Sequence, residues 1–167
     1  MENGAIKNIY LLRHGKVEGK AALNGFSDVL VQTEIQQRIC ESLIEQNLFL
    51  DCVVTSPLRR CSDLANLYAK RMALPLSIEP EFQEMNFGEV DGVAFDELDD
   101  KWAKLETFWQ DPANHQLSGA ESLQNFHDRV TQGWSQLLTN ESDNLLLVTH
   151  GGVIRMILAH CLDIDWK

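Results

Sequence analysis

Long apolar runs are missing from this sequence of 167 residues. No stretch approaches the roughly 20 residues needed to span a bilayer. Residues 1–8 have neither the apolar segment nor the cleavage pattern of a signal peptide. Internal repeats, linkers and low-complexity segments are missing as well. These absences predict a cytoplasmic protein with no membrane partner.

Cysteines with the spacing of a metal site or a disulfide framework are also missing. The four cysteines, at positions 40, 52, 61 and 161, include no Cys-x-x-Cys pair, and no His-x-His pattern accompanies them. A zinc site or a secreted disulfide scaffold relies on such patterns. We therefore expect buried, reduced thiols that act as small hydrophobic side chains, and neither a metal nor a cofactor.

Basic residues are scarce. The chain has 14 Lys and Arg against 25 Asp and Glu, which gives a formal net charge of −11. Nucleic-acid binding depends on basic surface that neutralises phosphates, so nucleic acid is not an expected partner. A small phosphorylated ligand is compatible with this charge, because a few arginines in a cleft reverse the potential locally.

Short apolar runs alternate with segments of helical period. Strands are expected at 9–12, 52–55, 76–78 and 145–149, and helices at about 33–47, 58–71, 95–109, 121–138 and 153–162. This alternation predicts an α/β fold with three α/β/α layers around a mostly parallel central sheet. The length predicts one domain, 1–167.

Several local features refine this plan. The acidic loop that starts at Phe87 and the helix after it predict a helical insertion at about 88–118 over the active site. The chain ends five residues after Leu162, so we expect a C-terminal strand to be missing.

Polar residues mark the expected starts of two helices. Ser56 is followed by Pro57, which predicts a cap and a proline at the first helical position. Ser118 and Glu121 have the spacing of a capping box and predict the start of the fourth helix.

Two of the expected strands stop at a histidine followed by a glycine. His14 ends the run 9–12, and His150 ends the run 145–149. Ligands bind outside the carboxyl ends of parallel strands, so we expect the two histidines to face each other across one site. Arg13 would make that site suitable for a phosphoryl group.

A third strand end leads into two adjacent arginines. Arg59 and Arg60 come shortly after the run 52–55, at the start of a helix, where free N–H groups and the macrodipole favour an anion. We expect one arginine to point into the cleft and the other to stay solvated.

Carboxylates and aromatic residues are mixed in the segment 81–92. A carboxylate among Phe82, Met85 and Phe87 would be partly desolvated. Desolvation raises the pKa of a carboxyl group, which suits it to donate a proton as a general acid.

These four elements together resemble the histidine phosphatase (phosphoglycerate mutase-like) superfamily over nearly the whole chain. The matching motifs are Arg-His-Gly at 13–15, Ser-Pro-x-x-Arg at 56–60, Glu-x-x-Phe-Gly-x-x-Asp-Gly at 84–92 and Thr-His-Gly-Gly at 149–152. The resemblance implies that His14 is the nucleophile and forms a phosphohistidine, and that Glu84 is the proton donor. It also implies that the phosphoryl oxygens are held by Arg13, Arg60, His150 and Gly151, without a metal.

Within the family, the segments 84–92 and 119–122 are most similar to α-ribazole-5′-phosphate phosphatases of cobalamin biosynthesis. Phosphoglycerate mutases are longer and have a phosphate-binding asparagine at the position where this chain has Lys20. Asn24 follows four residues later, so the extra phosphate contact is left open. We expect His115, His127 and His160 to lie outside the chemistry.

The sequence thus predicts a metal-independent phosphomonoesterase that acts on a small phosphorylated metabolite, namely α-ribazole 5′-phosphate. The alternatives are a broad-specificity phosphatase, a phosphoglycerate mutase-like enzyme, a protein-phosphohistidine phosphatase and a non-catalytic phospholigand-binding module. A binding module has no need of a proton donor, so the complete set of residues favours an enzyme. A homodimer is left open.

Overall fold

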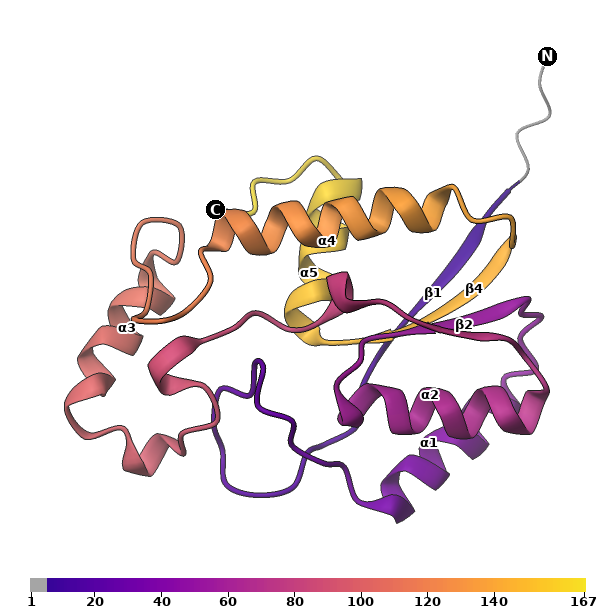
Figure 1. The fold of residues 1–167 in the computed structure, drawn as a ribbon, viewed down its shortest axis with the longest axis horizontal. Helices are drawn as coiled ribbons and strands as arrows, with labels where there is room; N and C mark the ends of the chain where they lie inside the picture. The colour runs from indigo at the N-terminus through magenta and orange to yellow at the C-terminus, as the bar shows by residue number, and fades with distance from the viewer. Residues whose placement is uncertain (1–5) are drawn as a thin grey trace.

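The central sheet has four strands that all run parallel (Figure 1). A computed structural model describes residues 6–167. The strands are β1 (Asn8–Arg13), β2 (Cys52–Thr55), β3 (Leu76–Ile78) and β4 (Asn144–Thr149), in the spatial order β1-β4-β2-β3. The four predicted strands are confirmed, and so is the α/β class.

Helices cover both faces of the sheet, which gives the predicted three layers (Figure 1). Helices α1 (Thr33–Glu45) and α2 (Arg59–Met72) lie on one face. Helices α4 (Leu123–Leu138) and α5 (Gly151–Cys161) lie on the other. Crossover helices on both faces bury a parallel sheet, and this burial explains why the strand sequences are apolar runs.

Strand β4 separates two hydrophobic cores. Leu145 and Leu147 pack into the core under α4 and α5, whereas Leu146 and Val148 pack into the core under α1 and α2. Successive side chains of a strand point to opposite faces, so one buried strand contributes to both cores. Burial on both faces fixes the position of β4, and it therefore also fixes the position of His150, the next residue.

Three strands end at the same edge of the sheet. The register pairs Arg13 with Thr149, and Thr55 of β2 with Val148 of β4. The N–H of His14 then donates to the carbonyl of Thr149 at 3.0 Å. The residues immediately after β1, β2 and β4 are therefore brought together, although about 90 residues or more separate β4 from the other two in sequence.

The segment expected to form a helix at 95–109 is only partly α-helical. Two 3₁₀ turns, Phe95–Glu97 and Asp99–Lys101, precede helix α3 (Trp102–Gln110). Asp99 has a φ of 45°, in the left-handed region, which interrupts a regular helix at that point. The predicted start of this helix is therefore wrong by seven residues.

Ser56 and Pro57 do not begin helix α2, so this predicted start is wrong. The helix begins at Arg59, and Leu58 is its N-cap residue. The Ser56 hydroxyl accepts a hydrogen bond from the N–H of Leu58 at 3.3 Å and is also bonded to His150. Ser56 thus shapes the turn before the helix.

The predicted capping box at the start of helix α4 is also wrong. The cap is Ser122, whose hydroxyl accepts a hydrogen bond from the N–H of Asn125 at 3.1 Å. Glu121 does not reach back to Ser118, because its carboxylate is ion-paired with Arg129 at 2.7 Å.

Three of the four cysteines are buried or partly buried, but Cys161 is exposed. The last turn of α5 extends past the packed core, where Leu158 and Leu162 are exposed as well. The expectation of burial is therefore wrong for Cys161. Among residues 6–167, the structure contains no helix with the length and apolar character needed to cross a membrane.

Candidate active site

A cavity of about 630 Å³ opens at the edge where the strands end. Arg13, His14 and Glu84 lie at its polar end, together with Gly151 at the start of α5. Its walls are mostly apolar and aromatic, and they include Met85, Phe87, Phe108, Trp109, Leu123, Phe126, Met156 and Trp166. Helix α3 and the residues after it thus form one side of this cavity, opposite the strand ends.

His14 follows the last residue of β1 and is partly buried. Its Nδ1 lies 2.8 Å from the carbonyl oxygen of Gly15. A carbonyl only accepts, so Nδ1 carries the proton and Nε2 keeps its lone pair. Burial lowers the pKa of His14 to about 4; the Gly15 bond opposes this shift, and the positive charges of Arg60 and Arg13 add to it. His14 is therefore neutral near pH 7 and has a free nitrogen.

His150 faces His14, as predicted, with 5.2 Å between the ring centroids. It follows β4 and is fully buried. Its Nδ1 accepts a hydrogen bond from Nε of Arg60 at 3.2 Å, so its proton lies on Nε2, which is 2.7 Å from the Ser56 hydroxyl. Burial lowers the pKa of His150, and the charge of Arg60 lowers it further.

The two adjacent arginines at the start of α2 have opposite environments. Arg60 is fully buried, and its guanidinium donates to the carbonyls of Asn24, Gly25 and Ser27 at 2.7–2.9 Å. Arg59 is exposed and pairs with an aspartate one turn along the helix. One arginine thus points inward and the other is solvated, as expected, but the inward arginine does not reach the cleft. Arg60 lies behind His150 and does not line the cavity.

Arg13 is exposed at the mouth of the site and lines the cavity. Within residues 6–167, no side-chain hydrogen bond occupies its guanidinium. It packs against the start of α5, so that a Cβ at Gly151 would lie 3.3 Å from Nε of Arg13. Free N–H groups at a helix N-terminus beside an available guanidinium form a site that favours an anion.

Glu84 belongs to an irregular segment, residues 81–86, which we call the strap. One carboxylate oxygen accepts a hydrogen bond from the N–H of Gly152 and the other from the N–H of Met85, each at 3.1 Å. Burial raises the pKa of Glu84 and outweighs these two N–H groups, which act in the opposite direction. A carboxyl group of raised pKa that lines a cavity is suited to donate a proton to a bound molecule.

The structure also locates the three residues whose roles the sequence leaves open. Asn24 lines the cavity. Lys20 is exposed and pairs with Asp96 and Glu97 at 3.1 and 2.8 Å. His115 is exposed and bonded to the carbonyl of residue 111, outside the cavity lining. Of Lys20 and Asn24, it is therefore Asn24 that lines the cavity.

Asp91 belongs to the motif at 84–92, but its role as a structural anchor was not predicted. Its carboxylate accepts hydrogen bonds from the N–H groups of Phe26, Ser27 and Phe87 at 2.8–3.0 Å, and from Gly25 at 3.3 Å. Burial acts to raise the pKa of Asp91, but these bonds outweigh it and lower the pKa. Asp91 and Arg60 thus bind the same loop, residues 24–27. Asp91 accepts from its N–H groups, and Arg60 donates to its carbonyls.

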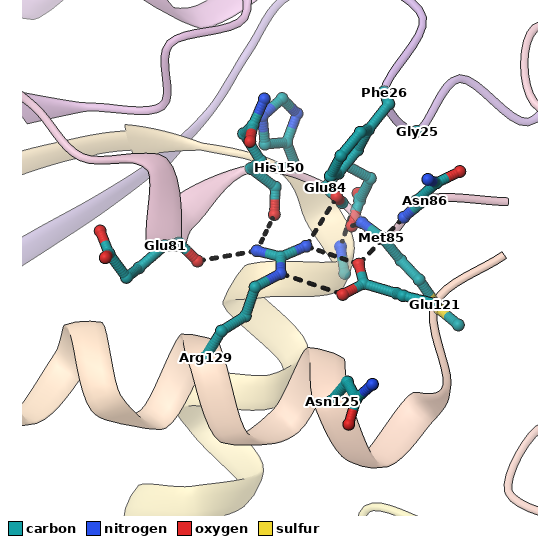
Figure 2. Close-up of polar contacts among 12 residues, drawn as sticks. Gly25, Phe26, Glu81, Glu84, Met85, Asn86, Glu121, Asn125, Arg129 and His150 are labelled. Carbon is teal, nitrogen blue, oxygen red and sulfur yellow. Dashed lines mark hydrogen bonds and ion pairs between the residues drawn. The ribbon is translucent and has the colours of Figure 1, made fainter. Parts of the chain in front are cut away.

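Arg129 is a residue that sequence reasoning missed. Its guanidinium lies between the strap and Glu121 and bonds to both (Figure 2). The available signal was its position in helix α4, three residues after Phe126 and four before Gly133, both of which are buried. A charged residue in an apolar stripe is uncommon unless it has a partner.

The arrangement combines a neutral imidazole with a free nitrogen, an available guanidinium, a helix N-terminus and a carboxyl group of raised pKa around one cavity. These are the components of phosphoryl transfer to a nitrogen nucleophile: charge stabilisation for the phosphoryl oxygens and a proton for the leaving group.

Comparison with known proteins identifies the family. The family model of the histidine phosphatase superfamily (branch 1) matches residues 9–167. A putative phosphoserine phosphatase of Hydrogenobacter thermophilus is 27% identical over 165 residues, which cover 92% of this chain and 77% of that protein. The adenosylcobalamin/alpha-ribazole phosphatase of Salmonella typhimurium is 29% identical and covers 92% of this chain and 79% of its own length.

A solved structure supports the fold. The putative alpha-ribazole-5′-P phosphatase of Escherichia coli superposes with a TM-score of 0.83 at 23% identity, over 96% of this chain and 81% of that chain. The chain spans only 31% of the length of three mycobacterial relatives, which are 30% identical over 112 residues. The match to the family model over nearly all of the sequence shows that this chain belongs to the histidine phosphatase superfamily and is a phosphatase.

Proposed function

We propose that this phosphatase hydrolyses phosphate monoesters through a phosphohistidine on His14. Nε2 of His14 attacks phosphorus while the bond from phosphorus to the leaving oxygen breaks. Glu84 donates its proton to that oxygen, and the alcohol departs. The observation that supports this step most directly is that a neutral His14, with Nε2 free, and the Glu84 carboxyl group, whose pKa is raised, line one cavity.

The second step reverses the role of Glu84. As a carboxylate it takes a proton from a water molecule, whose oxygen attacks phosphorus. The bond between phosphorus and Nε2 breaks, phosphate leaves, and both His14 and Glu84 return to their starting states.

In this proposal the phosphoryl oxygens are held by Arg13 and the N–H of Gly151 on the open side. Arg60 and His150 support the site from the buried side: neither lines the cavity, and the two ring nitrogens of His150 are bonded to Arg60 and Ser56. Arg60 has five N–H groups, and bonds to His150, Ser27, Asn24 and Gly25 use four of them, which leaves one on Nη1. Protein groups therefore supply the positive charge, and we propose that no metal takes part.

We further propose α-ribazole 5′-phosphate as the substrate. The aromatic residues Phe87, Phe108, Trp109 and Trp166 line the cavity and suit a planar, apolar base. Alpha-ribazole is named for a relative at 29% identity, and phosphoserine for another at 27%. α-Ribazole 5′-phosphate and phosphoserine are both phosphate esters of alkyl alcohols, which leave slowly unless the oxygen is protonated.

A substrate panel tests the assignment. We would measure kcat/KM for α-ribazole 5′-phosphate, phosphoserine and p-nitrophenyl phosphate with and without EDTA. The proposal predicts α-ribazole 5′-phosphate to be favoured over phosphoserine by about 10²-fold, because the aromatic wall adds binding energy, and no loss with EDTA. Equal values for all three esters would instead indicate a broad-specificity phosphatase. Activity that EDTA abolishes and a divalent ion restores would contradict the metal-free mechanism.

A further inference from the structure

Arg129 uses its whole hydrogen-bonding capacity on a few neighbouring groups. Nη1 donates to the carbonyls of Glu81 and Gln83 at 2.8 Å, and Nη2 donates to the carbonyl of Glu84 at 2.9 Å. The remaining N–H groups, on Nη2 and Nε, bond to the two carboxylate oxygens of Glu121 at 2.7 and 3.0 Å. All five N–H groups of the guanidinium are thus occupied.

The strap lies outside the regular secondary structure of the sheet, so its backbone carbonyls depend on Arg129 for hydrogen bonds. β3 ends at Ile78, and only a short 3₁₀ turn, Pro80–Phe82, precedes Glu84. The carbonyls of Glu81, Gln83 and Glu84 converge on one cation (Figure 2). Partly buried carbonyls without partners are costly, so this cation fixes the path of the backbone.

Glu121 fixes the other end of the strap. Its carboxylate accepts from the N–H of Asn86 at 3.0 Å, and its own N–H donates to the carbonyl of Asn86 at 3.1 Å. Arg129 and Glu121, which we call the bracket, therefore hold the backbone on both sides of the Glu84 side chain. The guanidinium also lies 4.9 Å from the centre of the Phe126 ring, which lines the cavity.

The bracket determines where the Glu84 carboxyl group meets a substrate. With the backbone fixed, that group is placed between the N–H of Gly152 and the N–H of Met85. A side chain at Gly152 would collide with the carboxylate, so there is little room for an alternative position. Arg129 itself does not line the cavity, so any effect of Arg129 on catalysis passes through the strap.

We propose that Arg129 and Glu121 are positioning residues that aim the Glu84 carboxyl group at the leaving-group oxygen. This inference rests on the proposed role of Glu84. Removing the bracket should therefore slow proton donation more than it slows substrate binding. A displacement of about 1 Å in a catalytic group costs up to about 10²-fold in rate.

Two substrates that differ by one methylene group separate positioning from a general structural effect. 4-Nitrophenyl phosphate releases a phenolate that needs little protonation, whereas 4-nitrobenzyl phosphate releases an alkoxide that needs a proton. We would use enzyme in excess over substrate and measure release of the alcohol or phenol in a single turnover. Under these conditions the release reports phosphoryl transfer to His14 and not the later hydrolysis.

We expect Arg129→Lys to slow release from 4-nitrobenzyl phosphate by about 10²-fold and release from 4-nitrophenyl phosphate by less than about tenfold. Lysine keeps the charge but offers three N–H groups and no planar fork. Glu121→Gln should show the same selectivity, and the double variant should be little worse than either single variant, because the two residues act as one unit.

Leu137→Ala is the matched control, since it removes a buried side chain from the same helix without touching the bracket. We expect it to lower the melting temperature while the ratio of the two release rates stays unchanged. If Arg129→Lys and Glu121→Gln slowed release from both substrates equally, or did not slow it, the positioning role would be overturned. The proposed function would still stand. If the wild-type protein formed no phosphohistidine, the proposed function would fail first, and the two failures are therefore distinguishable.

Discussion

The strand-edge side of the cavity and the side formed by helix α3 are built in different ways. Behind the strand edge, His150 and Arg60 are fully buried and bonded to each other; His150 follows β4 of the parallel sheet, and Arg60 lies at the start of α2. On the α3 side, Trp109 comes from a short helix and is 47% exposed. We therefore propose a division of labour in which the strand-edge side performs the reaction and the α3 side selects the leaving group.

The largest expected effect comes from the strand edge. His14→Ala should lower kcat by about 10⁶-fold, the scale seen when a covalent nucleophile is removed. His115→Ala is the matched control, because His115 is exposed and outside the cavity lining, and it should retain full activity. Steady-state hydrolysis of p-nitrophenyl phosphate measures both. An active His14→Ala variant would show that water attacks phosphorus directly.

Glu84→Gln should have the next largest effect, and one that depends on the substrate. For an alkyl phosphate such as a ribose 5′-phosphate, we expect the first chemical step to slow by about 10²–10⁴-fold. For p-nitrophenyl phosphate the pre-steady-state burst should slow much less, because the phenolate leaves without a proton. A burst that slows equally for both substrates would mean that Glu84 only shapes the pocket.

The pH profile gives a second measure of the same pair. His14 attacks in its neutral form, so kcat/KM should fall on the acid side only as the pH drops through about 4. Glu84 donates as an acid, so kcat/KM should fall on the alkaline side as the pH rises through its raised pKa. Glu84→Gln should remove the alkaline limb and leave the acid limb. Loss of wild-type activity between about pH 7 and pH 6, beyond the loss caused by protonation of the substrate phosphate with its pKa of about 6, would contradict the lowered pKa of His14.

Arg60→Ala and Arg59→Ala compare a buried and an exposed residue within one helix turn. Arg60→Ala should cost about 10²–10³-fold in kcat, by analogy with other charge-stabilising donors. It should also lower the free energy of unfolding by about 2 kcal/mol or more, because buried carbonyls lose their donor. Arg59→Ala should cost no more than about 0.5 kcal/mol, the scale of an exposed ion pair. Equal effects on kcat would refute the assigned register.

The smallest expected effect belongs to helix α3. Trp109→Ala should raise KM for α-ribazole 5′-phosphate by about tenfold with little change in kcat, because it removes apolar contact without touching the phosphoryl site. Trp102→Ala is the matched control, since Trp102 packs against Trp109 but does not line the cavity. A large loss of kcat in Trp109→Ala would contradict the proposed division of labour between the two sides of the cavity.

The strand edge could be predicted from the sequence because its signals are local. An apolar run that stops at a histidine and a glycine identifies both the strand and its end, as with His14 and His150. Parallel strands expose their carboxyl ends at one edge, so the meeting of these residues follows from the fold class alone.

The supporting contacts could not be predicted in the same way, because they join backbone atoms that are distant in sequence. Arg129 bonds to backbone carbonyls 45 to 48 residues away. Every residue has a backbone carbonyl, so the residue types do not show which carbonyls accept from a side chain. The predicted capping box failed for the same reason: Glu121 had a stronger partner in Arg129 than in the start of its own helix. The left-handed Asp99 likewise interrupts a segment whose apolar spacing looks helical.

The central claim is that the phosphoryl group passes through His14, and direct detection of the intermediate tests it best. We would mix the protein with a ³²P-labelled substrate, quench with alkali within the first turnover, and locate the label by peptide mass spectrometry. The account predicts an alkali-stable, acid-labile phosphohistidine on the peptide containing His14, and no label in His14→Ala. Turnover without any labelled peptide, or with label on His150 in place of His14, would contradict it.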